Sequence, residues 1–201
     1  MTSGRPDQPI KLASRTDRRD LQDQQRSAKA LRGMSQAATS IFLVRHGETA
    51  WNLQQRLQGQ CQENPPLNTT GERQAQALAE RLSSLPVAAI YSSDLQRTMQ
   101  TAHYVAARLE HMQVTSVVDL RERHLGVLEG LTRFEAAQQH PADFANLSGS
   151  PDAKPQGGES QNDVAQRVVS RIEQIASEHP GKTPHTFYKQ SWANAAMSRS
   201  A

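Results

Sequence analysis

The chain has 201 residues and one cysteine, Cys61, so an intrachain disulfide is excluded and a reducing compartment is expected, the cytoplasm in preference to a plastid. The length is enough for one domain with a sizeable core. A hydrophobic fraction of 36% and a mean hydropathy of −0.71 are low for a compact α/β domain, so part of the chain is not expected to pack. No apolar run is long enough to span a bilayer, which argues against a membrane partner.

Residues 1–38 are predicted to form a disordered basic arm, because they are rich in Gln, Arg, Asp and Ser and poor in apolar residues. Residues 1–40 contain eight Lys and Arg and four Asp, a net charge of +4. The whole chain carries +3, so residues 41–201 carry −1. The folded part therefore gives no electrostatic sign of a nucleic-acid partner. The four aspartates also argue against a transit peptide.

The first strand is expected at residues 41–44, a short apolar run that stops at Arg45, His46 and Gly47. In open α/β sheets, ligands bind at the carboxyl ends of the strands. This stretch therefore places a permanent cation and a titratable nucleophile where the mouth of a site is expected.

A regular alternation of helices and strands follows. Apolar residues at helical spacing predict a helix that begins at Thr69, and a strand is expected at residues 87–91. Asp94 is expected to cap a second helix, which leads to a strand at residues 114–118. The order βαβαβ favours a mostly parallel sheet with right-handed crossovers. The apolar faces comprise Ala75, Leu78, Ala79 and Leu82 in one helix and Thr98, Ala102, Val105 and Leu109 in the other.

The second half of the chain gives a weaker pattern. A short helix is expected near residues 134–139, followed by a loop rich in Ser, Gly, Pro and Asp. Ser160 and Asp163 have capping-box spacing and predict the start of a third long helix. The run His179-Pro180-Gly181 is expected to end it.

Four side chains that follow predicted strand ends suit the chemistry of a phosphate monoester. Arg45 and Arg97 offer paired, charge-assisted hydrogen bonds to a dianion. A neutral nitrogen of His46 is a competent nucleophile near pH 7. Glu122 is able to protonate the leaving alkoxide and then to activate water. Arginines would stabilise the charge, so neither a metal nor a cofactor is expected.

The run Arg45-His46-Gly47-Glu48-Thr49, followed by Trp51-Asn52, resembles the signature of the histidine phosphatase superfamily, the group that includes phosphoglycerate mutase. Three further segments resemble the family and fall in its order: residues 91–98, 120–130 and 157–160. The resemblance implies a three-layer α/β/α fold with a mostly parallel sheet.

The same resemblance assigns roles to single residues. It implies that His46 is the nucleophile, that Arg45 and Arg97 hold the phosphate, and that Glu122 is the acid and base. Asn52 matches a family position beside the phosphate. Further residues expected near the pocket are Gly47, Thr49, His124, Glu159 and Ser160.

The chain departs from the family after Lys182. The family carries a further strand and then a second histidine in a His-Gly pair, whereas this sequence continues through Thr183, Pro184 and His185 without an apolar strand. His185 follows a proline and is not expected to replace the missing histidine. A makeshift short strand at Phe187 and Tyr188 is left open. The expected organisation is a C-terminally incomplete domain at 39–182 with a divergent tail at 183–201. In that organisation the strand at 41–44 lacks a backbone partner, and turnover is impaired.

The favoured function is a metal-independent phosphomonoesterase that acts through a phosphohistidine on a small phosphorylated metabolite. Glu122-Arg123-His124-Leu125-Gly126 looks most like the plant-type metal-independent phosphoserine phosphatases, so phosphoserine is the first expected substrate. A mutase is the nearer alternative, but mutases carry a tyrosine in place of Leu125 and a longer insertion than the 26 residues between Gly130 and Gly157. A catalytically inactive protein that binds phosphate compounds or a partner is the other alternative, and a homodimer is left open.

Overall fold

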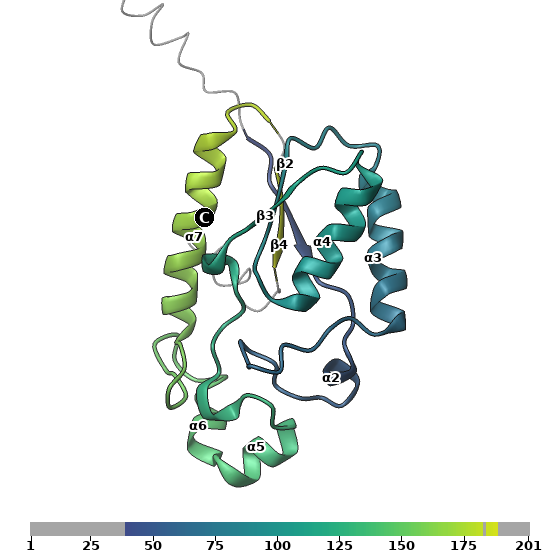
Figure 1. Ribbon diagram of the computed structural model, residues 1–201. Coiled ribbons are helices and arrows are strands. Elements are labelled where there is room, and N and C mark those ends of the chain that lie inside the picture. The colour runs from purple at the N-terminus through teal and green to yellow at the C-terminus, as the bar shows by residue number, and fades with distance from the viewer. Residues whose placement is uncertain (1–38, 183, 189–201) are drawn as a thin grey trace, which may run out of the picture. The chain divides into compact units, whose positions relative to one another are not determined.

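Four parallel strands form the centre of the computed structural model, which describes residues 39–182 and 184–188 (Figure 1). α3 (Thr69–Leu82) and α4 (Gln96–Arg108) cover one face of the sheet, and α7 (Gln161–Glu178) covers the other (Figure 1). The predicted three-layer α/β/α fold is therefore confirmed. In spatial order the strands are β1 (Phe42–Arg45), β4 (Pro184–Tyr188), β2 (Ala89–Ser92) and β3 (Val114–Ser116).

The alternation of side chains along β2 divides the core between the two faces. Ile90 belongs to a buried cluster with residues of α3 and α4, whereas Tyr91 belongs to a cluster with residues of α7. The cluster under α3 and α4 comprises Val44, Ala79, Leu82, Ile90, Ala102, Val105 and Ala106. The cluster under α7 comprises Tyr91, Val117, Leu120, Val164, Val168 and Ile175.

The long helices begin as local sequence signals dictate, with one exception. The capping box of α7 is confirmed, since Ser160 Oγ accepts from Asp163 N and Asp163 Oδ2 accepts from Ser160 N. The prediction that Asp94 caps α4 is wrong: Leu95 is the N-cap residue and makes no side-chain cap bond. Asp94 instead pairs with the guanidinium of Arg121, because a charge-assisted bidentate pair is stronger than a cap bond.

The connections carry shorter elements. α2 (Ala50–Leu53) lies in the loop after β1, and α5 (Arg133–Gln139) confirms the short helix expected there. α6 (Pro141–Ala145) was not expected, and its proline stands at a first-turn position where proline is tolerated. No helix within residues 39–182 and 184–188 is long and apolar enough to cross a membrane.

The expectation that no apolar strand follows Lys182 is wrong, and the makeshift short strand left open at Phe187 and Tyr188 is part of a strand of five residues. β4 lies inside the sheet and pairs in parallel with β1 on one side and β2 on the other. Pro184 is the first residue of this strand, a position where proline does little harm, and the Thr, Phe and Tyr that follow favour strands. Each residue of β1 therefore has a partner on β4, and the predicted loss of backbone pairing does not arise.

Candidate active site

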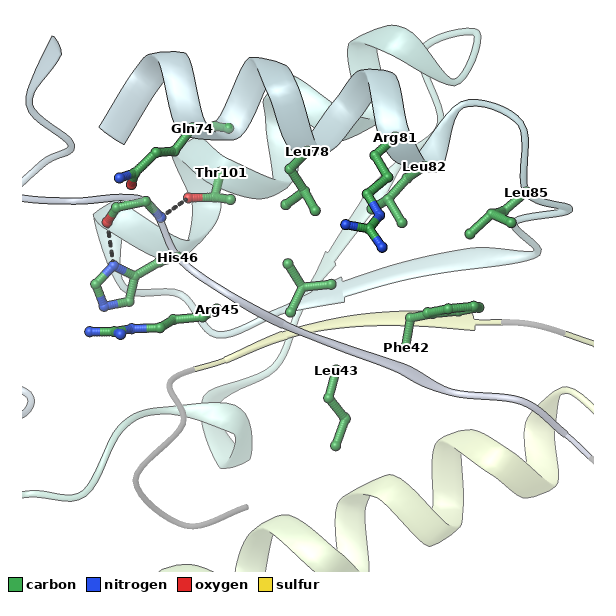
Figure 2. Close-up of a pocket in the computed structure, with 13 residues that line it drawn as sticks. Phe42, Leu43, Arg45, His46, Gln74, Leu78, Arg81, Leu82, Leu85 and Thr101 are labelled. Carbon is green, nitrogen blue, oxygen red and sulfur yellow. Dashed lines mark hydrogen bonds between the residues drawn. The ribbon is translucent and has the colours of Figure 1, made fainter. Parts of the chain in front are cut away.

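His46 follows β1 directly, and its ring is buried at 5% exposure. Nδ1 lies 2.6 Å from the carbonyl oxygen of Gly47 (Figure 2). A carbonyl oxygen can only accept, so Nδ1 carries the proton of the neutral ring. Nε2 is then the nitrogen with the lone pair, and it is the atom suited to nucleophilic attack.

Arg97, the second residue of α4, has no exposed surface. Its Nε donates to Nε2 of His46 over 3.3 Å, and its Nη2 donates to the carbonyl of Gly59 over 2.9 Å. Nη1 is buried and has no hydrogen-bond partner among the described residues. Burial lowers the pKa of Arg97, although the negative charges of Glu122 and Glu129 oppose this effect. A buried cation with an unused donor is chemically suited to bind an anion.

A cavity of about 200 Å³ adjoins His46 and is lined also by Arg45 and Asn52. Asn52 Oδ1 accepts from the backbone N–H and the hydroxyl of Thr49, which directs the amide nitrogen away from Thr49. Arg45 is exposed, and Figure 2 shows its guanidinium beside the ring of His46. His46 also lines a groove of about 650 Å³ between β1 and α3 (Figure 2), so the buried ring faces open space.

Glu122 lies in the irregular segment between two single 3₁₀ turns, η1 (Val118–Leu120) and η2 (Gly126–Leu128). The residue is 4% exposed, and its Oε1 accepts from the backbone N–H of Arg123 over 2.9 Å. Its charge partly opposes the lowering of the Arg97 pKa that burial causes. The structure thus gathers a histidine ring, a buried cation and a carboxyl group. Within residues 39–182 and 184–188, no three His, Cys, Asp or Glu side chains are grouped to hold a metal ion.

The chain has relatives among known proteins. The sequence profile described as histidine phosphatase superfamily (branch 1) matches residues 41–195. The chain belongs to the histidine phosphatase superfamily.

Two curated plant relatives from Arabidopsis thaliana agree with this membership. The chain is 45% identical over 148 residues to a metal-independent phosphoserine phosphatase, across 72% of this chain and 61% of the relative. It is 39% identical over 145 residues to phosphoglycerate mutase-like protein 4, across 71% of this chain and 62% of the relative. The chain thus aligns with about three-fifths of the length of these relatives.

Solved structures support the same fold. Bacillus stearothermophilus YhfR matches with a TM-score of 0.74 and 34% identity, over 81% of this chain and 79% of that chain. A mycobacterial glucosyl-3-phosphoglycerate phosphatase in complex with VO3 matches with a TM-score of 0.70 and 30% identity, over 78% of this chain and 79% of that chain. The predicted family and fold are both confirmed.

The superfamily's glycine at Gly47 permits a close approach to α3. A Cβ on Gly47 would lie 2.4 Å from the carbonyl oxygen of Gly71, so neither backbone leaves room for a side chain. The N–H of Gly47 donates to Thr101 Oγ1, which ties the loop of the nucleophile to α4 (Figure 2). Thr49 is fully buried and is the N-cap residue of α2. Both predicted pocket residues therefore shape the loop that holds His46.

The remaining predicted pocket residues have structural partners. Ser160 caps α7, and the carboxylate of Glu159 binds the guanidinium of Arg167 at two distances of 2.7 Å. Burial alone would raise the pKa of Glu159, but the hydrogen bonds from Arg167 and from the backbone of His124 keep it lowered. The half-exposed ring of His124 accepts from Gly126 N at Nδ1.

Sequence reasoning missed Gln58. Its side chain is 1% exposed, and neither polar atom of its amide has a hydrogen-bond partner among the described residues. Gln58 precedes Gly59, whose carbonyl accepts from Arg97, and it lines a cavity together with Asn52. Its position in a polar loop gave no periodic signal, and only the burial of that loop in the structure reveals it.

The second histidine of the family has no counterpart after β4. His185 is in register with Phe42 and Ile90, and Tyr188 is in register with Arg45. His185 thus lies toward the end of β1 that is away from His46. In the sequence, β4 is followed by Lys189 and Gln190 and not by a His-Gly pair. These two residues lie outside the described residues, as does the predicted arm at 1–38.

Proposed function

We propose that this chain is a metal-independent phosphomonoesterase that acts through a phosphohistidine on a small phosphorylated metabolite. The observation that carries the proposal is the fully buried guanidinium of Arg97 beside Nε2 of His46. Its Nη1, which no described residue bonds, is a donor for a phosphoryl oxygen. Arg45 and Asn52 line the adjoining cavity and add a second cation and an amide.

Two balanced steps follow from this arrangement. In the first step, Nε2 of His46 attacks phosphorus, the ester P–O bond breaks, and the protonated carboxyl of Glu122 gives its proton to the leaving oxygen. In the second step, a water molecule attacks phosphorus, Glu122 takes a proton from this water, and the N–P bond breaks. Glu122 is thereby protonated again, and His46 and inorganic phosphate are released.

The proposed substrate carries a carboxylate as well as the phosphate, with phosphoserine as the first choice. A cavity of about 350 Å³ shares Asn52 with the phosphate cavity, and it is lined by Arg133 and by Arg56, which also pairs with Glu135 over 3.4 Å. Such a lining favours a second negative charge on the substrate. The name of the plant phosphoserine phosphatase that the chain resembles supports this choice.

Hydrolysis is favoured over mutase transfer. Leu125 lines the cavity at the position where the resemblance gives the mutases a tyrosine. The names of the mutase-like relatives keep transfer as the second candidate. Release of inorganic phosphate from phosphoserine, without rearranged phosphoglycerate from 3-phosphoglycerate, would support hydrolysis. The opposite result would favour the mutase.

Turnover is proposed to be slow because the chain has no His-Gly pair after β4. Removing one donor that stabilises the transferring group typically lowers the rate by about 10²–10³. The test is to incubate the protein with [³²P]phosphoserine, quench it, and measure acid-labile, alkali-stable label. Label in the wild-type chain that is lost in His46→Asn supports the phosphohistidine. Absence of label at every time point, with no phosphate released, favours the inactive binding protein.

A further inference from the structure

The general acid Glu122 stands on a segment with no regular structure of its own. Residues 121–125 lie between the turns η1 and η2 and belong to no helix or strand. The position of such a segment depends on bonds from outside it, since no ladder of backbone bonds defines it. The place of the carboxyl group of Glu122 therefore depends on the side chains that hold its backbone.

Arg167, on α7, supplies two of these bonds and a third to Asp119, just before the segment. Its Nη1 donates to the carbonyls of Asp119 and Arg121, both over 2.8 Å, and its Nη2 donates to the carbonyl of Glu122 over 3.0 Å. Its Nε and Nη2 also bind the two carboxylate oxygens of Glu159 over 2.7 Å. These contacts use all five N–H donors of the guanidinium. A lysine, with three donors on one nitrogen, has no means of reproducing them.

Glu159 extends the same network to the far side of Glu122. Its carboxylate accepts from the backbone N–H of His124 over 2.8 Å, and its own N–H donates to the carbonyl of His124 over 2.9 Å. Gln60 adds a third support, since its Nε2 donates to the carbonyl of Glu122 over 2.8 Å. The backbone on both sides of Glu122 is thus fixed to the start of α7.

We propose that Arg167 is a positioning residue, which holds the segment so that the carboxyl of Glu122 meets the leaving-group oxygen. The inference rests on the proposed function, in which Glu122 donates a proton as the ester P–O bond breaks. Arg167 touches neither the phosphate cavity nor His46, so its effect on the reaction passes through the backbone of Glu122.

The test uses Arg167→Gln and Arg167→Lys, with Arg171→Gln as the matched control. Arg171 lies one turn further along α7, and its Nη1 donates to Gln174. The substrates are an alkyl phosphate, phosphoserine, whose leaving oxygen needs a proton, and 2,4-dinitrophenyl phosphate, whose phenolate leaves without one. The quantity measured is the rate at which the leaving group, serine or dinitrophenolate, is released in a single turnover.

We expect Arg167→Gln to lower release from phosphoserine by about 10–10²-fold, the effect of a misplacement of about 1 Å. Release from dinitrophenyl phosphate should change by about threefold or less, since no proton transfer is needed. Arg167→Lys should lie between Arg167→Gln and the wild type, and Arg171→Gln should match the wild type on both substrates. In a Glu122→Gln background, Arg167→Gln should add no further loss on phosphoserine. Equal losses on both substrates, or a further loss in that background, would overturn the inference.

A second measurement keeps the inference apart from the proposed function. Amide hydrogen exchange of a peptide covering residues 119–124 should be faster in Arg167→Gln than in the wild type and unchanged in Arg171→Gln. If the wild-type chain forms no phosphoenzyme, the proposed function fails while this exchange result still decides whether Arg167 holds the segment. Unchanged exchange in Arg167→Gln contradicts the inference whatever the activity.

Discussion

Nε of Arg97 donates to Nε2 of His46 over 3.3 Å, so the buried cation contacts the atom that would attack phosphorus. The same guanidinium is fixed by the carbonyl of Gly59 through Nη2, which leaves Nη1 for a ligand. The contact also requires that Nε2 be unprotonated, in agreement with the proton that Nδ1 shares with the carbonyl of Gly47. The cation therefore orients the ring of His46, and under the proposed function its Nη1 would bind the phosphoryl group.

Arg97→Lys should lower phosphoenzyme formation by about 10²–10³, the usual effect of losing a preorganised donor in a phosphoryl-transfer site. A lysine keeps the charge, but one ammonium group has no planar fork to bind His46, Gly59 and the ligand together. The measurement is the rate of phosphohistidine formation. Arg108→Lys is the control, because Arg108 lies on the same helix and its side chain makes an exposed pair with Glu80. Equal rates in the two variants would contradict the role of Arg97.

Arg133→Ala should weaken the apparent affinity for phosphoserine by about tenfold, because a hydrogen bond to a charged group contributes roughly 1.5–3 kcal/mol. Ethyl phosphate, which has no carboxylate, should be bound as well by the variant as by the wild type. KM values for both substrates check this, and Arg73→Ala, at an exposed site on α3, is the control. Equal changes in KM for the two substrates would show that Arg133 does not recognise the carboxylate.

The family and the three-layer fold could be predicted because short motifs and regular apolar spacing carry them. Ser160 and Asp163 show this well, since a capping box depends on neighbours only. Asp94 shows the limit of this approach. It pairs with Arg121, which is distant in the sequence, and therefore does not cap α4. The extent and place of β4 were not predicted because the paired backbones of β1 and β2, and not its own apolar pattern, define its place. Gln58 and Arg167 escaped notice for the same reason, because their partners and burial come from tertiary packing.

Gly71→Ala should destabilise the fold by roughly 1–3 kcal/mol, the usual cost of overpacking. A Cβ at this position would lie 2.1 Å from the backbone carbonyl oxygen of Glu48, which is unable to move without disturbing the loop of His46. Urea unfolding followed by circular dichroism measures the change. Gly149→Ala is the control, since the nearest atom to a Cβ at Gly149 lies at 3.4 Å. If Gly71→Ala unfolds at the same urea concentration as the wild type, the backbones at Gly71 and Glu48 are not in tight contact.

Two ion pairs predict how stability responds to acid. The hydrogen bond from Arg121 lowers the pKa of Asp94, and the pKa of Glu159 is lowered by Arg167 in spite of burial. A carboxyl whose folded pKa lies below its unfolded value stabilises the fold above the unfolded value, about 4, and this stabilisation disappears as the pH falls through the folded pKa. Unfolding free energies measured from pH 7 downward should therefore begin to fall below about pH 5. Asp94→Asn should flatten that decline; an equally steep decline in the variant would show that Asp94 does not contribute to it.

The double substitution Lys189→His and Gln190→Gly should raise turnover. Tyr188 is in register with Arg45, and Lys189 follows Tyr188 in the sequence as His46 follows Arg45. The substitutions restore the His-Gly pair that the superfamily carries after this strand, and an added donor for the phosphoryl group should increase the rate by about 10²-fold. Steady-state release of phosphate from phosphoserine measures the gain, and the same substitutions in a His46→Asn background provide the control. Turnover equal to that of the original chain would show that the missing histidine is not what limits this protein.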